Sequence, residues 1–195
     1  MRAASILLLA LAACSPKAPE GAPTATPATQ VSVVAPAGAA GCAITTSRPW
    51  QAGGARYTIE ASLHGAACGS AAALLVIRNA QGATLYADAA PVTQLDLAFN
   101  PRTDDATMTH DVAAWITGEG YGPTAAGLPA WPADAARPPG AFFAMIDQAT
   151  YEAARAGAWP LFCYPNGGES AACVAQDARH GVLVRLGDTR PEAMP

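Results

Sequence analysis

Positive charge is scarce in this sequence. Of its 195 residues, 11 are lysine or arginine and 15 are aspartate or glutamate, and Lys17 is the only lysine. The basic residues form no cluster along the chain. Because binding to nucleic acids depends largely on lysine and arginine contacts with phosphates, we expect no nucleic acid among the partners of this protein.

Large hydrophobic residues are also scarce. Leu, Ile, Val and Phe together account for 33 of the 195 residues, and alanine supplies much of the 51% hydrophobic content. A share this low is typical of disordered chains when the net charge is high, but here the net charge is only -4. The composition therefore predicts a folded domain with a thin core.

The sequence has no hydrophobic run long enough to cross a membrane. Its apolar stretch at residues 6–13 follows Arg2 and is much shorter than the roughly 20 residues of a membrane-spanning helix. A positive residue before a short apolar run is typical of a signal peptide. The run leads into Leu-Ala-Ala-Cys at residues 11–14, which resembles the lipobox of bacterial lipoproteins.

The resemblance to bacterial lipoproteins covers residues 1–15 and implies how the protein is anchored. By this resemblance, residues 1–13 are a signal peptide, and Cys14 becomes the mature N-terminus with its acyl chains in the lipid bilayer. An aspartate after the cysteine would be the usual signal for the inner membrane, but Ser15 stands there. The resemblance thus favours the outer membrane, facing the periplasm, over the inner membrane or the cell surface. The alternative is an ordinary secretory signal in which Cys14 is incidental.

The composition divides the rest of the chain into two parts. Residues 14–40 begin with the lipidated cysteine and are rich in Pro, Ala and Thr, which predicts a disordered tether. The remaining residues, 41–195, are enough for one domain of ordinary size. We therefore expect a single periplasmic-type globular domain at the end of a lipid-anchored tether.

Four cysteines remain in the predicted domain, namely Cys42, Cys68, Cys163 and Cys173. An even number in an oxidising compartment predicts two disulfides. Three pairings are possible, and the local one, Cys42 with Cys68 and Cys163 with Cys173, is favoured because each pair encloses a self-contained unit. The alternative of a zinc site lacks support because the sequence has no C-x-x-C motif.

The residue pattern of the domain predicts an α+β fold: a small antiparallel sheet with two short helices, stapled by two disulfides. Alternation of polar and apolar residues and the intervening turns predict strands at residues 43–47, 57–63, 74–78, 83–86 and 141–146, a hairpin over residues 160–176, and a last strand at residues 181–187. Apolar residues at helical spacing predict helices from Asp104 or Thr107 to Gly118 and from a cap at Asp147 to about Ala156.

The region of the first predicted helix carries an acidic group: Asp104, Asp105, His110, Asp111 and Glu119. Their oxygen and imidazole atoms are suitable ligands for a divalent cation if the loop folds back. The spacing matches neither an EF-hand nor H-E-x-x-H. The alternative is that the aspartates complement the helix dipole while His110 points to solvent, and we predict no cofactor.

A second group, Ser170, Asp177 and His180, has the residue types of a nucleophile, a base and a residue that orients it. It lacks the G-x-S-x-G turn that exposes a serine nucleophile. The alternative is that Asp177 and His180 belong to a turn with the sequence QDARHG. We therefore assign no catalytic residue.

A long loop rich in glycine and proline carries Tyr121 and Trp131. A loop of this length in a compact domain either performs a function or covers the core, and the sequence leaves both possibilities open. If the loop is functional, these two aromatic side chains are candidate binding residues.

Two classes of function follow from these patterns. The favoured hypothesis is an envelope lipoprotein with a non-enzymatic binding or structural domain, whose partner is a cell-envelope protein or a glycan. The alternative is a periplasmic hydrolase or metal-dependent enzyme, which requires one of the acidic groups to converge in a pocket with perturbed pKa values. A third hypothesis is a lysozyme-inhibitor-like protein, which the chain resembles in size and anchoring only.

Overall fold

A computed structural model describes residues 41–118, 122–140, 142–177 and 179–190. The expected signal peptide, Cys14 and the tether lie outside the described residues, as do Glu119 and Tyr121. The architecture below therefore concerns the predicted domain alone.

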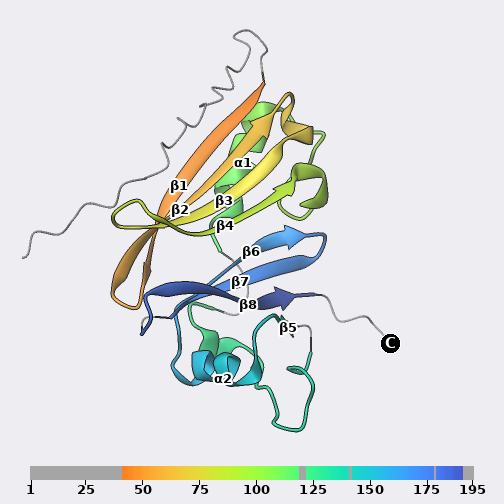
Figure 1. Ribbon diagram of the computed structural model, residues 1–195. Coiled ribbons are helices and arrows are strands. Elements are labelled where there is room, and N and C mark those ends of the chain that lie inside the picture. The colour runs from red at the N-terminus through yellow and green to blue at the C-terminus, as the bar shows by residue number, and fades with distance from the viewer. Residues whose placement is uncertain (1–40, 119–121, 141, 178, 191–195) are drawn as a thin grey trace, which may run out of the picture. The chain divides into compact units, whose positions relative to one another are not determined.

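The first half of the domain forms a four-stranded antiparallel sheet in the order β1-β2-β3-β4. Its strands are β1 (Cys42–Ala52), β2 (Ala55–Gly65), β3 (Ala72–Asn79) and β4 (Thr84–Pro91). The helix α1 (Asp105–Trp115) packs along β1 and β2 (Figure 1). The predicted strands and the hairpin that joins β3 to β4 are confirmed, although β1 and β2 are longer than the alternating segments that predicted them.

The second half forms another four-stranded antiparallel sheet, in the order β5-β8-β7-β6. Its strands are β5 (Phe142–Ala144), β6 (Leu161–Gly167), β7 (Ser170–Asp177) and β8 (Val182–Thr189). The helix α2 (Gln148–Ala156) and the short 3-10 turn η3 (Ala125–Gly127) pack together and share a hydrophobic core with this sheet (Figure 1).

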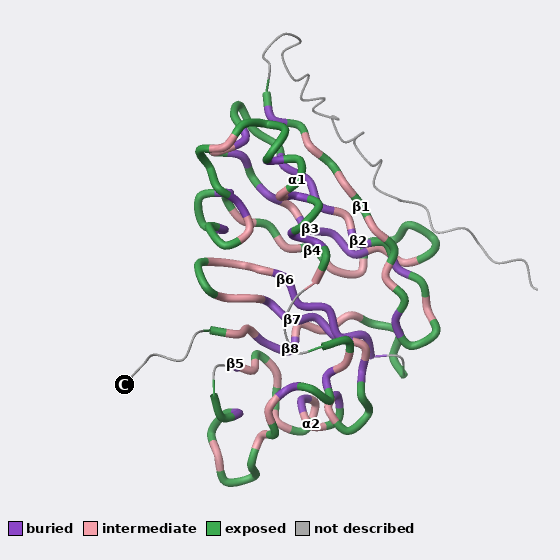
Figure 2. Tube along the Cα trace, turned by 180° about the vertical axis from the view of Figure 1, so that it is seen from behind, coloured by how far each residue is buried: buried purple, intermediate pink, exposed green. Residues whose placement is uncertain are grey.

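The second sheet is buried on both faces. Successive residues of a strand point to opposite faces, so Phe162 and Tyr164 on β6 point to one side and Leu161 and Cys163 to the other. The first pair belongs to a core shared with the first sheet and α1, and the second pair to a core shared with α2. Figure 2 shows buried residues along β6 and β7 accordingly. The second sheet is therefore the middle layer of the domain.

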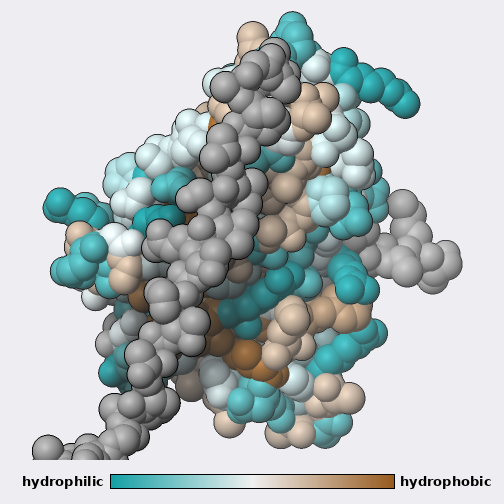
Figure 3. Space-filling view, turned by 45° about the horizontal axis from the view of Figure 1, so that its top comes forward, coloured by the Kyte–Doolittle hydropathy of each residue, from teal (hydrophilic) through white to brown (hydrophobic). Residues whose placement is uncertain are grey.

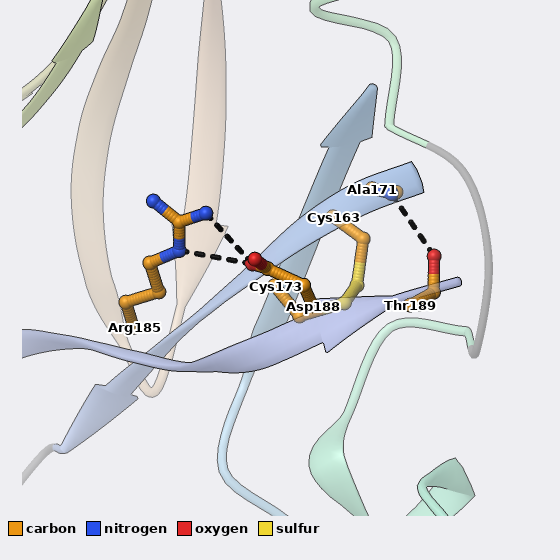
Figure 4. The surroundings of a disulfide bond; sticks show 6 residues. All are labelled: Cys163, Ala171, Cys173, Arg185, Asp188 and Thr189. Carbon is orange, nitrogen blue, oxygen red and sulfur yellow. Dashed lines mark hydrogen bonds and ion pairs between the residues drawn. A yellow bond between two sulfur atoms is a disulfide. The ribbon is translucent and has the colours of Figure 1, made fainter. Parts of the chain in front are cut away.

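Both disulfides have the predicted local pairing. Cys42 at the start of β1 is bonded to Cys68, which opens the 3-10 turn η1 (Cys68–Ser70), with a Cα–Cα distance of 4.8 Å. Cys163 and Cys173 lie directly opposite each other on β6 and β7, with a Cα–Cα distance of 4.1 Å (Figure 4). The α+β class is confirmed, and its strands are divided between two sheets.

Both helices begin at the predicted aspartate caps. The side chain of Asp104 accepts a hydrogen bond of 2.8 Å from the backbone N–H of Thr107, and Asp147 accepts one of 2.9 Å from Thr150. These bonds satisfy backbone donors that the first turn of a helix leaves free. Neither described helix is long and apolar enough to cross a membrane.

Candidate functional site: a polar pocket between the two sheets

Three β-bulges lie next to the place where the two sheets meet. The strand register skips one residue at Leu85 on β4, at Asn166 on β6 and at Leu186 on β8. A bulge redirects the neighbouring side chains, and bulges are more common beside functional sites than elsewhere. The bulges on β4 and β8 adjoin Tyr86 and Arg185, which belong to the polar network described below. The bulges thus mark the junction of the two sheets as a candidate functional site.

The bulge on β8 brings Arg185 and Asp188 to the same face. Residues three positions apart in a regular strand point to opposite faces, but the extra residue Leu186 shifts the alternation by one. The guanidinium of Arg185 consequently donates two hydrogen bonds to Oδ1 of Asp188, 3.0 Å from Nε and 2.7 Å from Nη2 (Figure 4). This pairing fixes the arginine side chain at the edge of the junction between the sheets.

A hydrogen-bonded network joins β4, β6 and β8 at this junction. The hydroxyl of Tyr164 donates to Oδ2 of Asp88 over 2.6 Å, and it lies 2.7 Å from the hydroxyl of Tyr86. Since a phenol has only one proton to donate, Tyr86 is the donor to Tyr164. Nη1 of Arg185 lies 3.7 Å from Oδ2 of Asp88 and so adds a positive charge beside that carboxylate.

The network keeps its phenols neutral and its guanidinium charged. Burial raises the pKa of Tyr164 far above the ordinary value, and the neighbouring Tyr86 and Asp88 raise it further. Burial also raises the pKa of Tyr86, despite its hydrogen bond with Tyr164. Burial alone would lower the pKa of Arg185, but the hydrogen bond and charge of Asp188 outweigh this effect and raise it. At neutral pH the phenols are therefore hydrogen-bond donors and not bases.

The network borders a pocket of about 220 Å³, which we call the seam pocket. Its polar lining consists of Asp88, Gln94, Tyr164, Asn166 and Arg185, and its apolar lining includes Leu95 and Trp115. Gln94 comes from the 3-10 turn η2 (Val92–Gln94) that follows β4. Oδ1 of Asn166 is buried and has no hydrogen-bond partner among the described residues. A buried acceptor without a partner is unfavourable, so the amide of Asn166 is not fully satisfied by the described protein groups.

The acidic group predicted as a metal site is spread along α1. Asp104 caps the helix, Asp105 lies exposed in its first turn, and the side chain of His110 is 83% exposed. Nδ1 of His110 lies 3.7 Å from Oδ1 of Asp111. Among the described residues, no three His, Cys, Asp or Glu side chains gather in a way that could hold a metal ion.

The possible catalytic group is not assembled. Ser170 begins β7 and Asp177 ends it, a span of roughly 23 Å in an extended strand. Oδ2 of Asp177 lies 2.5 Å from Nδ1 of His180, and the backbone N–H of Arg179 donates to Oδ1 over 2.9 Å. The hydrogen bond with His180 lowers the pKa of Asp177. Asp177 and His180 therefore stabilise the turn after β7, which is the alternative that the sequence allowed.

Trp131 holds its loop against α2. Its backbone N–H donates to Oε1 of Glu152 over 2.6 Å, and its indole N–H donates to the carbonyl of Ala135 over 2.9 Å. Its ring meets that of Tyr151 edge to face, with centroids 5.6 Å apart. The structure therefore supports a covering role for this part of the loop, while Tyr121 lies outside the described residues.

Sequence reasoning missed the residues of the seam pocket and of the hydrogen-bonded network beside it. Tyr86, Asp88, Tyr164 and Arg185 come from three strands distant in the sequence, and the bulges that aim some of them leave no clear sequence pattern. The one available signal was Arg185, a charged residue that interrupts the apolar run VLVRL. A charge in such a run indicates a partner or a site.

Comparison of the chain with protein-family models, with curated proteins and with solved structures gives no match. The function must therefore be argued from the geometry of the domain itself.

Proposed function

We propose that the protein is a lipid-anchored component of the bacterial cell envelope whose domain binds a ligand without chemical conversion. The resemblance of residues 1–15 to the lipobox region supports the anchor. The seam pocket supports the binding role, because its lining holds hydrogen-bonding side chains whose positions are fixed by the network between the sheets.

The lining of the seam pocket favours a neutral ligand rich in hydroxyl groups. Asp88 offers an acceptor, Arg185 offers donors, and the side-chain amide of Gln94 offers both. The guanidinium of Arg185 pairs with Asp188 and also lies near Asp88, so it is not free to balance the charge of an anionic ligand. A hydroxyl group both donates and accepts, which matches this mixture. A single sugar ring of an envelope glycan has the required chemistry.

The same network argues against catalysis in the seam pocket. A general base requires a pKa near the working pH, whereas the pKa values of Tyr164 and Tyr86 are both raised from an ordinary value that is already high. Asp88 accepts a hydrogen bond from Tyr164 and lies beside Arg185, so it holds the network in place. A binding role therefore fits these side chains better than a hydrolytic one.

The exposed surface is consistent with binding in a pocket rather than on a broad apolar face. On the face seen in Figure 3, hydrophilic and pale colours predominate, and strongly hydrophobic colour is confined to a small area. The large hydrophobic side chains that are exposed among the described residues are Leu97, Met145 and Val182, which come from three separate segments of the chain.

A melting experiment with glycan fragments tests this proposal. The full chain, produced in an oxidising compartment, is heated with and without N,N′-diacetylchitobiose, a soluble and neutral disaccharide of N-acetylglucosamine. A ligand that binds only the folded state raises the melting temperature, and at about 100 times its Kd it adds about 2.7 kcal/mol of stability. We expect the melting temperature to rise for the unmodified protein and the disaccharide to be recovered intact.

Two glutamines provide a matched pair of variants. Gln94→Ala removes a polar group from the seam pocket, whereas Gln81→Ala removes one from the exposed turn between β3 and β4. The disaccharide should stabilise the Gln81→Ala variant as it does the unmodified protein, and should stabilise the Gln94→Ala variant less. Equal stabilisation of both variants, or no rise in the unmodified protein, would contradict binding in the seam pocket. Cleavage of the disaccharide would favour the enzyme alternative.

A further inference from the structure

A second pocket, at the other end of the aromatic row on β6, contains an arginine that has no acidic partner among the described residues. Phe162 and Tyr164 share a face of β6, with ring centroids 5.8 Å apart, and Tyr164 borders the seam pocket while Phe162 borders this second pocket. The second pocket, which we call the Arg48 pocket, has a volume of about 310 Å³ and is lined by residues that include Arg48, Trp50, Leu161 and Phe162.

Arg48 differs from the other partly buried arginines of the described chain. The partly buried arginines of the described chain are Arg48, Arg78, Arg155 and Arg185. Arg78 pairs with Glu60 at 3.7 Å, Arg155 with Glu152 at 2.7 Å and Arg185 with Asp188 at 2.7 Å. Among the described residues, no carboxylate forms an ion pair with Arg48. Burial consequently lowers the pKa of Arg48, with no carboxylate to compensate for the lost hydration.

The position of Arg48 is fixed, so its terminal nitrogens are ready for a ligand. Its Nε donates to the carbonyl of Ile116, just beyond the end of α1. Its guanidinium carbon lies 5.4 Å from the centre of the Phe162 ring, in a cation–π contact. Neither contact engages the terminal Nη1 and Nη2 atoms. A guanidinium held in this way loses little side-chain freedom when it binds an anion.

We propose that the Arg48 pocket binds a carboxylate attached to a small aromatic or aliphatic group. A single guanidinium balances the single charge of a carboxylate, and its two terminal nitrogens match the two carboxylate oxygens. The lining formed by the described residues includes no lysine or histidine and no second arginine, so a phosphate dianion would remain partly uncompensated. The partly buried Trp50 offers apolar surface for the rest of the ligand, and the buried Leu161 and Phe162 close the pocket behind it. This inference does not depend on the ligand of the seam pocket.

Calorimetric titration of the full chain with a matched pair of ligands tests the charge requirement. N-acetyl-L-phenylalanine has a carboxylate and an aromatic group, and N-acetyl-L-phenylalaninamide differs only in lacking the charge. We expect the acid to bind with a Kd below about 1 mM and the amide to bind at least about tenfold more weakly. Phenylacetate has the carboxylate and the aromatic ring but no peptide-like amide. It should bind as well, because the proposed contacts involve only the carboxylate and the apolar group. Inorganic phosphate should bind more weakly than either acid.

Variants of two arginines locate the binding. Arg48→Gln removes the charge from the pocket, and we expect at least tenfold weaker binding of the acid. Arg48→Lys keeps a charge without the planar pair of donors and should weaken binding severalfold. Arg78→Gln removes a partly buried arginine that does not line this pocket, and it should leave the affinity unchanged. If Arg48→Gln fails to fold, Arg48→Lys and the comparison of acid with amide still test the proposal.

Several outcomes would overturn the proposal. These are equal affinity of the acid and the amide, unchanged affinity in a folded Arg48→Gln variant, phosphate binding as tight as that of the acids, or no binding of either acid at about 10 mM. Increasing the salt concentration from about 0.05 M to about 0.5 M should weaken the binding of the acid, because Arg48 is only partly buried. An affinity that does not change with salt would also count against a charge-based site.

Discussion

The hydroxyl of Tyr164 on β6 donates a hydrogen bond of 2.6 Å to Oδ2 of Asp88 on β4, across 76 positions of sequence. This bond connects the two sheets, and both side chains border the seam pocket. The phenol and the carboxylate therefore contribute to stability and to the shape of the pocket at the same time.

Tyr164→Phe should reduce the free energy of unfolding by about 1–3 kcal/mol, because it removes both hydrogen bonds of the hydroxyl and leaves Oδ2 of Asp88 without its hydrogen bond. Denaturation by urea at pH 7 measures this change. Tyr86→Phe is the matched control, since it removes one bond and leaves the bond from Tyr164 to Asp88 intact. If Tyr164→Phe lowers the free energy of unfolding no more than Tyr86→Phe does, the hydrogen bond from Tyr164 to Asp88 does not stabilise the fold as we expect.

The protein should lose stability in alkaline solution. Burial raises the pKa values of Tyr57, Tyr86 and Tyr164 in the folded state. A raised pKa of an acid that is neutral when protonated means that the folded state holds the proton more tightly than the unfolded state. The resulting stability is complete below the unfolded pKa of about 10 and is lost as the pH rises above it.

Tyr164→Phe should make this alkaline loss less steep. Each such phenol contributes a slope of up to about 1.4 kcal/mol per pH unit above pH 10, and the variant lacks one of them. Unfolding free energies measured at pH 8, 9.5 and 10.5 give the two curves. Parallel curves would show that ionisation of Tyr164 is not linked to unfolding.

Local patterns in the sequence predicted most of the secondary structure. The turn between β3 and β4, the aspartate caps of both helices and the opposed cysteines on β6 and β7 are all contained in short segments. Their physical causes are local, since a cap or a tight turn depends on residues only a few positions apart. These features are therefore readable without knowledge of the fold.

The division into two sheets and the position of the seam pocket were not predicted. Alternation along β6 shows which residues share a face, but it does not show that both faces are covered. The bulge at Leu186 turns Asp188 toward Arg185, and no residue type in VLVRLGD identifies it. Such a site depends on contacts between distant strands, which one sequence does not reveal.

Removal of either disulfide should lower the stability by a similar amount. The bond between Cys163 and Cys173 closes a separation of 10 residues, and that between Cys42 and Cys68 one of 26. In the chain-entropy description, these loops correspond to about 3 and about 3.5 kcal/mol, because the effect grows only with the logarithm of loop length. Double alanine variants of each pair, unfolded in urea, measure the losses. If only one of the two double variants is less stable than the unmodified protein, the disulfide removed in the other variant does not constrain the unfolded chain.

Glu152 should control how firmly the loop around Trp131 is held. The backbone N–H of Trp131 lowers the pKa of Glu152, and a hydrogen bond from Arg155 lowers it further. Glu152→Ala removes this acceptor while keeping a residue that favours the helix α2. Amide hydrogen exchange, followed by mass spectrometry, should become faster in peptides from residues 122–140.

Peptides from β1 to β3 provide the internal control for Glu152→Ala, because they belong to the first sheet and should exchange at an unchanged rate.

Acidification of the unmodified protein should also make amide exchange faster in residues 122–140. A lowered carboxyl pKa contributes stability above the unfolded value of about 4.3, and this stability is lost as the pH falls through the folded pKa. Faster exchange throughout the domain in Glu152→Ala would indicate a general loss of stability and contradict a local clamp.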